Sequence, residues 1–156
     1  MTNWKARFFT IWAGQQASLF GSQIVQFALV WWLTQETGSA TVLATASLVA
    51  MLPQILVGPF SGALVDRLSR RWVMVAADSA IALVSLGLAY LFWSGGIRVW
   101  HIYLAMALRS VGGGFHWPAM AATTPLMVPE RHLTRVAGLN QAASGALNIV
   151  SPPLGA

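Results

Sequence analysis

The sequence contains no cysteine, which excludes disulfide bonds and thiolate metal sites. Charge is scarce as well, since charged residues make up 8% of the 156 residues, against about a quarter in ordinary globular domains. Residues 8–35, 37–65 and 79–97 carry no charge at all. Each reaches the roughly 18 to 20 residues with which a helix crosses a bilayer. These absences predict an all-α protein that crosses a membrane several times.

Catalytic signatures are also missing. The sequence has neither a His-Glu-x-x-His zinc motif nor a Gly-x-Ser-x-Gly nucleophile motif. Its three histidines, His101, His116 and His132, are 15 and 16 residues apart and are expected at different depths, which is poor geometry for a shared metal. We therefore expect no enzyme activity, no metal site and no cofactor.

What the chain has in abundance is apolar surface, with 56% hydrophobic residues. Hydrophobic runs and the turns between them predict five helices, at about residues 8–34, 42–65, 72–94, 100–127 and 136–156. Residues 1–156 are thus expected to form one transmembrane helical bundle without a soluble domain, in direct contact with the lipid bilayer.

The placement of basic residues predicts the orientation. The net charge is +5, and seven of the nine basic residues lie at three helix ends: Lys5 and Arg7, then Arg67, Arg70 and Arg71, then Arg131 and Arg135. Since cytoplasmic loops carry an excess of Lys and Arg, these ends and the N-terminus are predicted to face the cytoplasm, with Arg98 outside. A nucleic-acid partner is not expected, because no soluble domain is there to present a basic patch.

Two stretches suggest an internal repeat. Residues 58–63 and 151–156 both read small-Pro-x-x-Gly-Ala, at an offset of 93 residues. At the same offset Gln16 corresponds to Arg109 and Gly21 to Gly114, on helices that cross in opposite directions. Inverted three-helix repeats are typical of secondary transporters, and chance similarity of small residues is the alternative. The repeat predicts a sixth helix beyond residue 156, so that the chain would be a piece of a longer protein.

Two charged residues lie inside predicted helices. Placing a cation such as Arg109 near mid-bilayer costs at least about 2.5–3.5 kcal/mol, so it is expected to face a partner or a polar cavity. Asp78 is the one acid in a predicted span, at a depth that an arginine could largely reach. Arg109 is therefore predicted to pair with Asp78 or to line the cavity, and a purely structural ion pair is the equal alternative.

Other polar side chains form stripes at helical spacing. They are Gln15, Ser18, Ser22 and Gln26 on the first helix, and Gln141, Ser144, Asn148 and Ser151 on the fifth. Such stripes either line an aqueous path or bond neighbouring helices. We interpret a lone His116 as structural, although histidine can change its charge near neutral pH, and the glycines of residues 112–114 as a close-packing site.

The turn between the second and third helices carries a family signature. It reads Gly62-x-Leu-x-Asp66-Arg67-x-x-Arg70-Arg71 and strongly resembles the cytoplasmic loop motif of the major facilitator superfamily, with Ser69 in place of the usual glycine. Gly62 is expected to let a neighbouring helix approach, Asp66 to pair with a cation or a facing helix N-terminus, and the arginines to donate to a partner acid. A plain basic cytoplasmic loop is the alternative.

The fourth helix extends the resemblance. Arg109 followed by glycines is similar to the superfamily's fourth-helix arginine motif, and residues 3–5 and 12–15 look like the macrolide-efflux branch of drug exporters. The antiporter-type motif of the fifth helix is present only in part, as Ser151-Pro152-x-x-Gly155. Gly113, Pro152 and Gly155 are the helix-packing positions that this resemblance implies.

The resemblance implies the N-terminal half-bundle of a twelve-helix exporter in a bacterial inner membrane, completed by a C-terminal half. Such a protein would exchange protons for a small-molecule substrate by alternating access. Arg109, Gln15, Gln26 and Asn148 would be cavity residues near the midplane, and Asp66 with its arginines would latch the cytoplasmic gate. The alternatives are a non-transporting membrane segment that associates with another protein, or export of a siderophore or another small solute.

Overall fold

The computed structural model describes residues 4–155, apart from the side chain of Asp66. This part of the chain contains five α-helices and one 3₁₀ turn: α1 (Trp4–Thr37), α2 (Ala40–Arg67), α3 (Arg70–Trp93), α4 (Val99–Met127), η1 (Glu130–His132) and α5 (Leu133–Gly155). The predicted all-α class and the five helices are confirmed. Their ends lie within four residues of the predicted ones.

The fifth helix begins earlier than the sequence predicts. It begins at Leu133, although residues 129–135 are predicted as a loop. Pro129 starts the turn with φ −58°, and its carbonyl accepts the amide of His132 at 2.8 Å, so the chain winds into η1 at once. Leu133 already has helical dihedrals, and the turn therefore continues into α5 without a break.

The junction between α1 and α2 shows why two long helices need only two linking residues. Gly38 ends α1 with φ +56°, a conformation that favours glycine. Ser39 then caps α2, because its Oγ accepts the amide of Val42 at 3.4 Å. The chain thus reverses direction while both helix ends keep hydrogen-bond partners.

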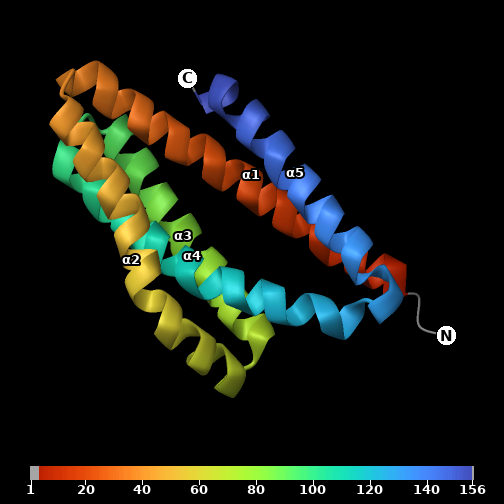
Figure 1. Cartoon of the computed structure of the whole chain (residues 1–156). Coiled ribbons are helices and arrows are strands. Elements are labelled where there is room, and N and C mark those ends of the chain that lie inside the picture. The colour runs from red at the N-terminus through yellow and green to blue at the C-terminus, as the bar shows by residue number, and fades with distance from the viewer. Residues whose placement is uncertain (1–3, 156) are drawn as a thin grey trace. The chain divides into compact units, whose positions relative to one another are not determined.

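The chain divides into two compact units. The central unit is Trp32–Met120, and the terminal unit combines Met1–Trp31 with Ala121–Ala156. In the central unit α3 runs antiparallel to α4, and α2 runs parallel to α4 (Figure 1). A buried cluster of Val65, Met74 and Ala119 lies among these helices.

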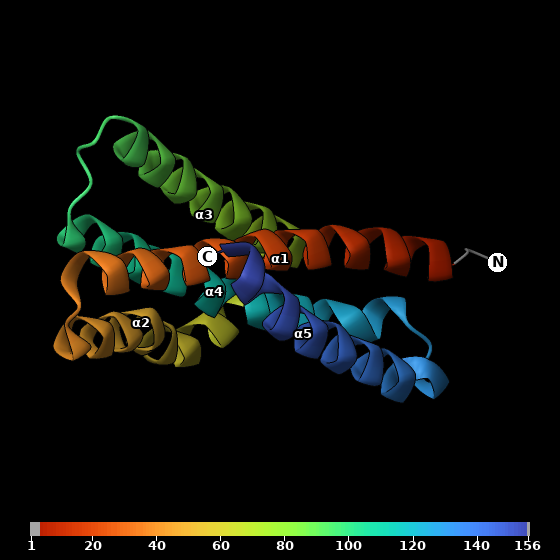
Figure 2. The same ribbon diagram turned by 90° about the horizontal axis from the view of Figure 1, so that it is seen from above.

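In the terminal unit α1 and α5 lie side by side and run in the same direction (Figure 1). Their apolar core is Phe8 and Val136, with Val128 from the end of α4. The two helices draw together toward the end of α5, as Figure 2 shows. There an added Cβ on Gly155 would lie 2.7 Å from the carbonyl oxygen of Ile24. Both sets of helix directions agree with spans that alternate through a membrane.

The surface of this protein differs from that of a water-soluble domain. Large apolar side chains are exposed, for example Phe60 at 74% and Leu83 at 69%, whereas Arg109 and His116 are buried. Within the described residues, three helices are long and apolar enough to cross a membrane: α1, α3 and residues Ala40–Val65 of α2. An outward apolar surface of this extent needs lipid or protein to cover it.

Candidate functional site

The central unit buries its one interior cation between α3 and α4. Arg109 is 8% exposed, and its Nη1 donates a hydrogen bond of 2.5 Å to Oγ of Ser85. A buried guanidinium is tolerable in a membrane protein only where such partners are provided. Ser85 is a partner that the sequence alone does not identify.

A second polar pair lies two helical turns further along the same two helices. Nε2 of His116 lies 3.4 Å from Oδ1 of Asp78, an ion-pair distance, and His116 is 6% exposed. The spacing from Asp78 to Ser85 and from Arg109 to His116 is seven residues in each case. Since seven residues return to the same helix face, antiparallel α3 and α4 present the two pairs along one seam.

The predicted roles of Asp78 and His116 can now be placed. Asp78, proposed from sequence as the partner of Arg109, has His116 as a neighbour at 3.4 Å, and both the pairing with Arg109 and the structural role of His116 stay predictions. The missing signal was the register of α3 against α4, which the sequence does not state. The seven-residue spacing of Asp78 and Ser85 indicates only that the two side chains share a face of α3.

Glycines make this seam possible. An added Cβ on Gly112 would lie 2.9 Å from Cγ1 of Ile81 on α3, and one on Gly114 would lie 3.4 Å from Cα of Gln54 on α2. At Gly113 the nearest atom would be Oε1 of Gln54 at 3.7 Å, an ordinary contact. The close approach thus falls on the two neighbours of Gly113, because they face α3 and α2.

Ser110 completes the seam on the α2 side. Its Oγ accepts the backbone amide of Gln54 at 3.1 Å, directly after Pro53 on α2. The proline at 53 supplies no backbone N–H and loosens the local hydrogen-bond ladder. A serine on α4 thus bonds backbone on α2, and α4 is held on both sides.

The terminal unit uses its polar residues differently. Gln15 and Gln26 of α1 are half-buried, whereas Asn148 of α5 is exposed. The hydrogen bond between α1 and α5 is instead made by Trp12, whose Nε1 donates to Oδ1 of Asn140 at 2.7 Å. Asn140 lies one turn after the buried Val136, so both residues are on the face of α5 that packs against α1.

The end of α5 carries the partial antiporter-type motif. Ser151 is buried, Pro152 is half-buried and Gly155 packs against Ile24 and Phe27 of α1. A proline inside a helix frees a carbonyl and permits bending. The motif therefore lies at a close approach of α5 to α1.

The basic loop motif lies at the junction of α2 and α3, where Leu68 and Ser69 are the only residues between the helices. Arg67 and Arg71 are exposed and Arg70 is half-buried, while the side chain of Asp66 lies outside the described part of the structure. Ser69 has φ −65°, which any residue adopts. The absence of the family's glycine at this position therefore causes no backbone strain.

Among the described residues no neighbouring helix approaches Gly62, and its predicted role stays a prediction. An added Cβ there would meet no atom within 4 Å among the described residues. The reason is that α2 turns Ser61 and Val65 inward at this end, and both are buried. Gly62 lies on the neighbouring, more open face.

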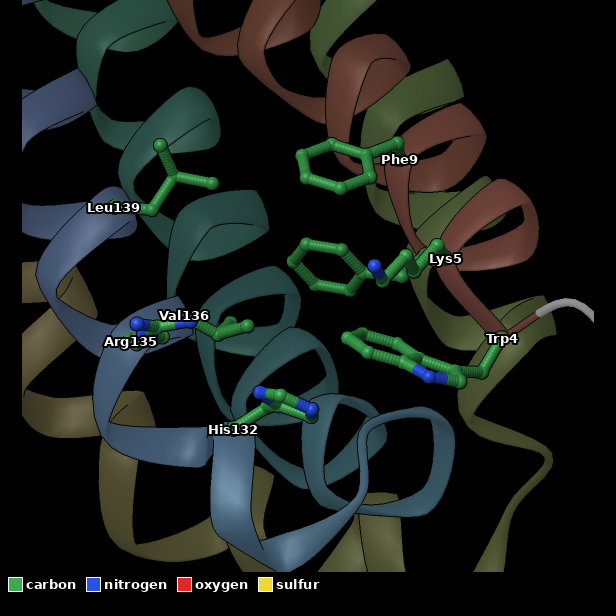
Figure 3. A pocket seen from close by; sticks show the side chains of 8 residues that line it. Trp4, Lys5, Phe9, His132, Arg135, Val136 and Leu139 are labelled. Atoms are coloured by element: carbon green, nitrogen blue, oxygen red, sulfur yellow. The ribbon is translucent and has the colours of Figure 1, made fainter.

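The terminal unit also contains a cavity of about 260 Å³ at the start of α1 and α5. Figure 3 shows Trp4, Lys5 and Phe9 on the side of α1, opposite Val136 and Leu139 of α5, with His132 below them. The ring of Trp4 stacks on His132 with centroids 5.1 Å apart. Arg135 and Phe8 complete the lining. Across the described residues, no three His, Asp or Glu side chains are grouped to hold a metal ion.

A helical bundle with apolar side chains outside and an arginine and a histidine buried between its helices is a membrane protein with several spans. Comparison with known proteins gives the family. Residues 11–156 match the Major Facilitator Superfamily, and the chain belongs to this superfamily.

Relatives in the superfamily are efflux proteins and transporters. The chain is 45% identical over 154 residues to Macrolide efflux protein A of Streptococcus pyogenes, which covers 99% of this chain and 38% of that protein. It is 41% identical over 119 residues to Macrolide efflux protein A of Enterococcus faecalis, covering 76% of this chain and 36% of that protein. The uncharacterized MFS-type transporter YfiS of Bacillus subtilis is 26% identical over 104 residues, which are 67% of this chain and 24% of that protein. No solved structure matches the chain.

The chain thus spans a little over a third of the length of the macrolide efflux proteins that it matches. The resemblance to a macrolide-efflux branch of the superfamily, inferred from the sequence, is confirmed.

Proposed function

We propose that the chain belongs to an exporter that carries macrolides or other lipophilic compounds out of a bacterial cell. The observation that carries this proposal is the similarity to Macrolide efflux protein A, which extends over nearly the whole chain. The protein would act in the inner membrane as a transporter rather than an enzyme. A second set of helices, the equivalent of the rest of those relatives, would complete the path for substrate.

The orientation in this proposal has the N-terminus in the cytoplasm. Lys5 and Arg7 before the long apolar part of α1, and the arginines at the α2–α3 junction, support it. In this arrangement α4 and α5 also cross the bilayer, since their 29 and 23 residues are long enough to do so. The basic loop, with Asp66, would then latch and release the cytoplasmic gate during alternating access.

The seam between α3 and α4 supports proton exchange as the driving force. Arg109 provides a buried charge bonded to Ser85, and Asp78 lies at an ion-pair distance from His116, so two polar pairs lie between the same two helices. A proton taken up there would change the local charge by one unit and so favour one conformation over another. Gln15, Gln26 and Asn148 remain candidates for contacts with substrate.

The test is extrusion of a labelled macrolide from an efflux-deficient bacterium that expresses the native reading frame. We expect extrusion to stop when the proton gradient is collapsed and to return when it is restored. Arg109→Lys keeps the charge but loses the guanidinium geometry, and His116→Asn removes the imidazole that lies beside Asp78. Each should slow extrusion about tenfold, as expected for losing an interaction worth up to about 1.7 kcal/mol.

Arg98→Lys is the matched control, because Arg98 is exposed and lies in the turn before α4. It should leave extrusion unchanged. Full proton-coupled extrusion by the Arg109→Lys and His116→Asn variants would contradict the coupling role. A chain that inserts stably but extrudes neither a macrolide nor a lipophilic dye would instead favour a non-transporting membrane segment.

A further inference from the structure

The cavity between α1 and α5 has an amphipathic lining that the transport proposal does not use. One part of it is apolar, formed by Phe8, Phe9, Val136 and Leu139. The other part carries Lys5 and Arg135, with His132 stacked on Trp4 beside them. Lys5 and Arg135 come from helices 130 positions apart in the sequence, so the fold, and not a local charge run, brings them to one cavity.

No acidic residue in the described part of the chain pairs with the two basic side chains of this cavity. No acidic side chain lines it, and neither α1 nor α5 has an acidic residue in its first turn. Arg109 in the central unit has a hydrogen-bond acceptor in Ser85, whereas no described side chain forms an ion pair with Lys5 or Arg135. Both side chains are exposed, so their donors are available to an anion that enters the cavity.

The size of the cavity restricts that anion. Its volume of about 260 Å³ is several times the roughly 30 Å³ that a water molecule occupies, yet it falls below the range of about 300–1,000 Å³ of pockets that hold drug-sized ligands. The cavity is therefore too small for a macrolide and large enough for a headgroup. Its open side exposes Phe9, which is 48% exposed and offers an apolar surface to an attached chain.

The place of the cavity along the helices points to the membrane surface. Helix α1 is apolar enough to span a bilayer, and its 34 residues extend about 51 Å at 1.5 Å per residue, beyond a hydrocarbon core of about 30 Å. Its first turns, which hold Trp4 and Lys5, therefore reach the headgroup region. Tryptophan and lysine are residues that favour this region.

We infer that this cavity binds the phosphate headgroup of an anionic phospholipid between Lys5 and Arg135. The apolar side chains of α1 and α5 contact the beginning of its acyl chains. Basic pockets between transmembrane helices bind anionic lipids by this combination of charge and apolar contact. The inference is independent of the transported substrate, because it concerns the helix ends and not the α3–α4 seam.

The experiment is native mass spectrometry of the purified chain in detergent, titrated with phosphatidylglycerol. We expect one tightly retained lipid. In the double variant Lys5→Gln/Arg135→Gln its dissociation constant should rise about tenfold or more. The matched control Arg7→Gln/Arg131→Gln removes the same charge from the same end, at exposed residues that do not line the cavity. It should change the dissociation constant less than about twofold.

Further arms separate the possible ligands and guard against misfolding. Zwitterionic phosphatidylethanolamine should bind about tenfold more weakly than phosphatidylglycerol, and the charge-conserving Lys5→Arg/Arg135→Lys variant should retain the lipid. Equal weakening by the two glutamine double variants would reduce the site to general surface charge and overturn the inference. Inorganic phosphate binding as tightly as phosphatidylglycerol would also overturn it, since a free anion would then suffice.

Discussion

The polar contacts between α3 and α4 are made by charged side chains, a histidine and a serine, whereas the polar contact between α1 and α5 that the structure shows joins a tryptophan to an amide. Gly112 brings the first pair of helices together, and Arg109–Ser85 and Asp78–His116 lie along their seam. In the terminal unit Trp12 bonds Asn140 from α1 to α5. One interface thus positions charge, and the other mainly joins two apolar helices.

The difference extends to the glycines of the two units. On α4, Gly112 and Gly114 in the middle of the helix would meet neighbouring atoms if they carried a Cβ, whereas on α5 Gly155 at the helix end would do so and Gly138 and Gly145 would meet nothing within 4 Å. Small residues allow helix backbones to approach closely in membranes, where lipid gives no hydrophobic drive to association. The close approach at α4 lets short polar side chains such as Ser85 and Ser110 reach their partners.

The largest effect is expected from Gly112→Leu. A leucine would place its side chain where Cβ alone comes 2.9 Å from Ile81, and overpacking of this kind costs about 3 kcal/mol. Separation of α3 from α4 would also lengthen the Arg109–Ser85 bond. The free energy of unfolding in mixed detergent micelles, followed by circular dichroism, measures the loss.

The control is Gly138→Leu on α5, which adds the same side chain in open space. We expect a change within about 0.5 kcal/mol. Similar losses for the two variants would show that the loss at residue 112 does not come from its contact with Ile81.

A smaller loss is expected from Gly155→Ala in the terminal unit. The added methyl would come 2.7 Å from the carbonyl oxygen of Ile24, and a backbone atom cannot rotate away. The cost should be about 1–2 kcal/mol, less than for Gly112→Leu because alanine adds a single carbon. In contrast, Gly145→Ala meets no neighbour and should stabilise α5 by up to about 1 kcal/mol through helix propensity. Thermal melts that rank the two alanine variants the other way would refute this reading of α5.

The hydrogen bonds of the two interfaces are expected to differ by less. Ser85→Ala removes the acceptor of the buried Arg109 and should cost about 1 kcal/mol, whereas Trp12→Phe removes a half-buried bond and should cost about 0.6 kcal/mol. The same unfolding titration resolves the two values when each is referred to the unaltered chain. A larger loss for Trp12→Phe would mean that the terminal interface depends more on its polar contact.

The sequence predicts the helices of both units well and their contacts less well. Charge-free runs identify α1, α2 and α3, because a spanning helix must exclude charge, and the cost of an isolated cation identifies Arg109 as a residue that needs partners. Ser85 and the pairing of Asp78 with His116 depend on the rotation and register of α3 against α4. Those are set by how Gly112 and Ile81 fit, which depends on three-dimensional packing.

The polar stripes are too coarse a guide to the contacts of the terminal unit. The polar stripe on the fifth helix emphasises Asn148, which is exposed, while Asn140 bonds Trp12. Helical spacing states which residues share a face but not which face meets a neighbour. The buried Val136 supplies that information only once the structure is known.

The smallest effect on stability is expected from Gly62→Ala, and it tests the loop motif most sharply. No described atom lies within 4 Å of an added Cβ, so the free energy of unfolding of the chain should change by less than about 0.5 kcal/mol. Gly62 could instead contact helices outside the described residues when the gate closes. In that case Gly62→Ala should still lower macrolide extrusion by the native reading frame about tenfold, the effect of about 1.4 kcal/mol on a rate. Unchanged stability with impaired extrusion would place the partner of Gly62 in the other half of the transporter. Unchanged extrusion would leave Asp66 and the arginines as the working part of the motif, and the open face of α2 as simple lipid-facing surface.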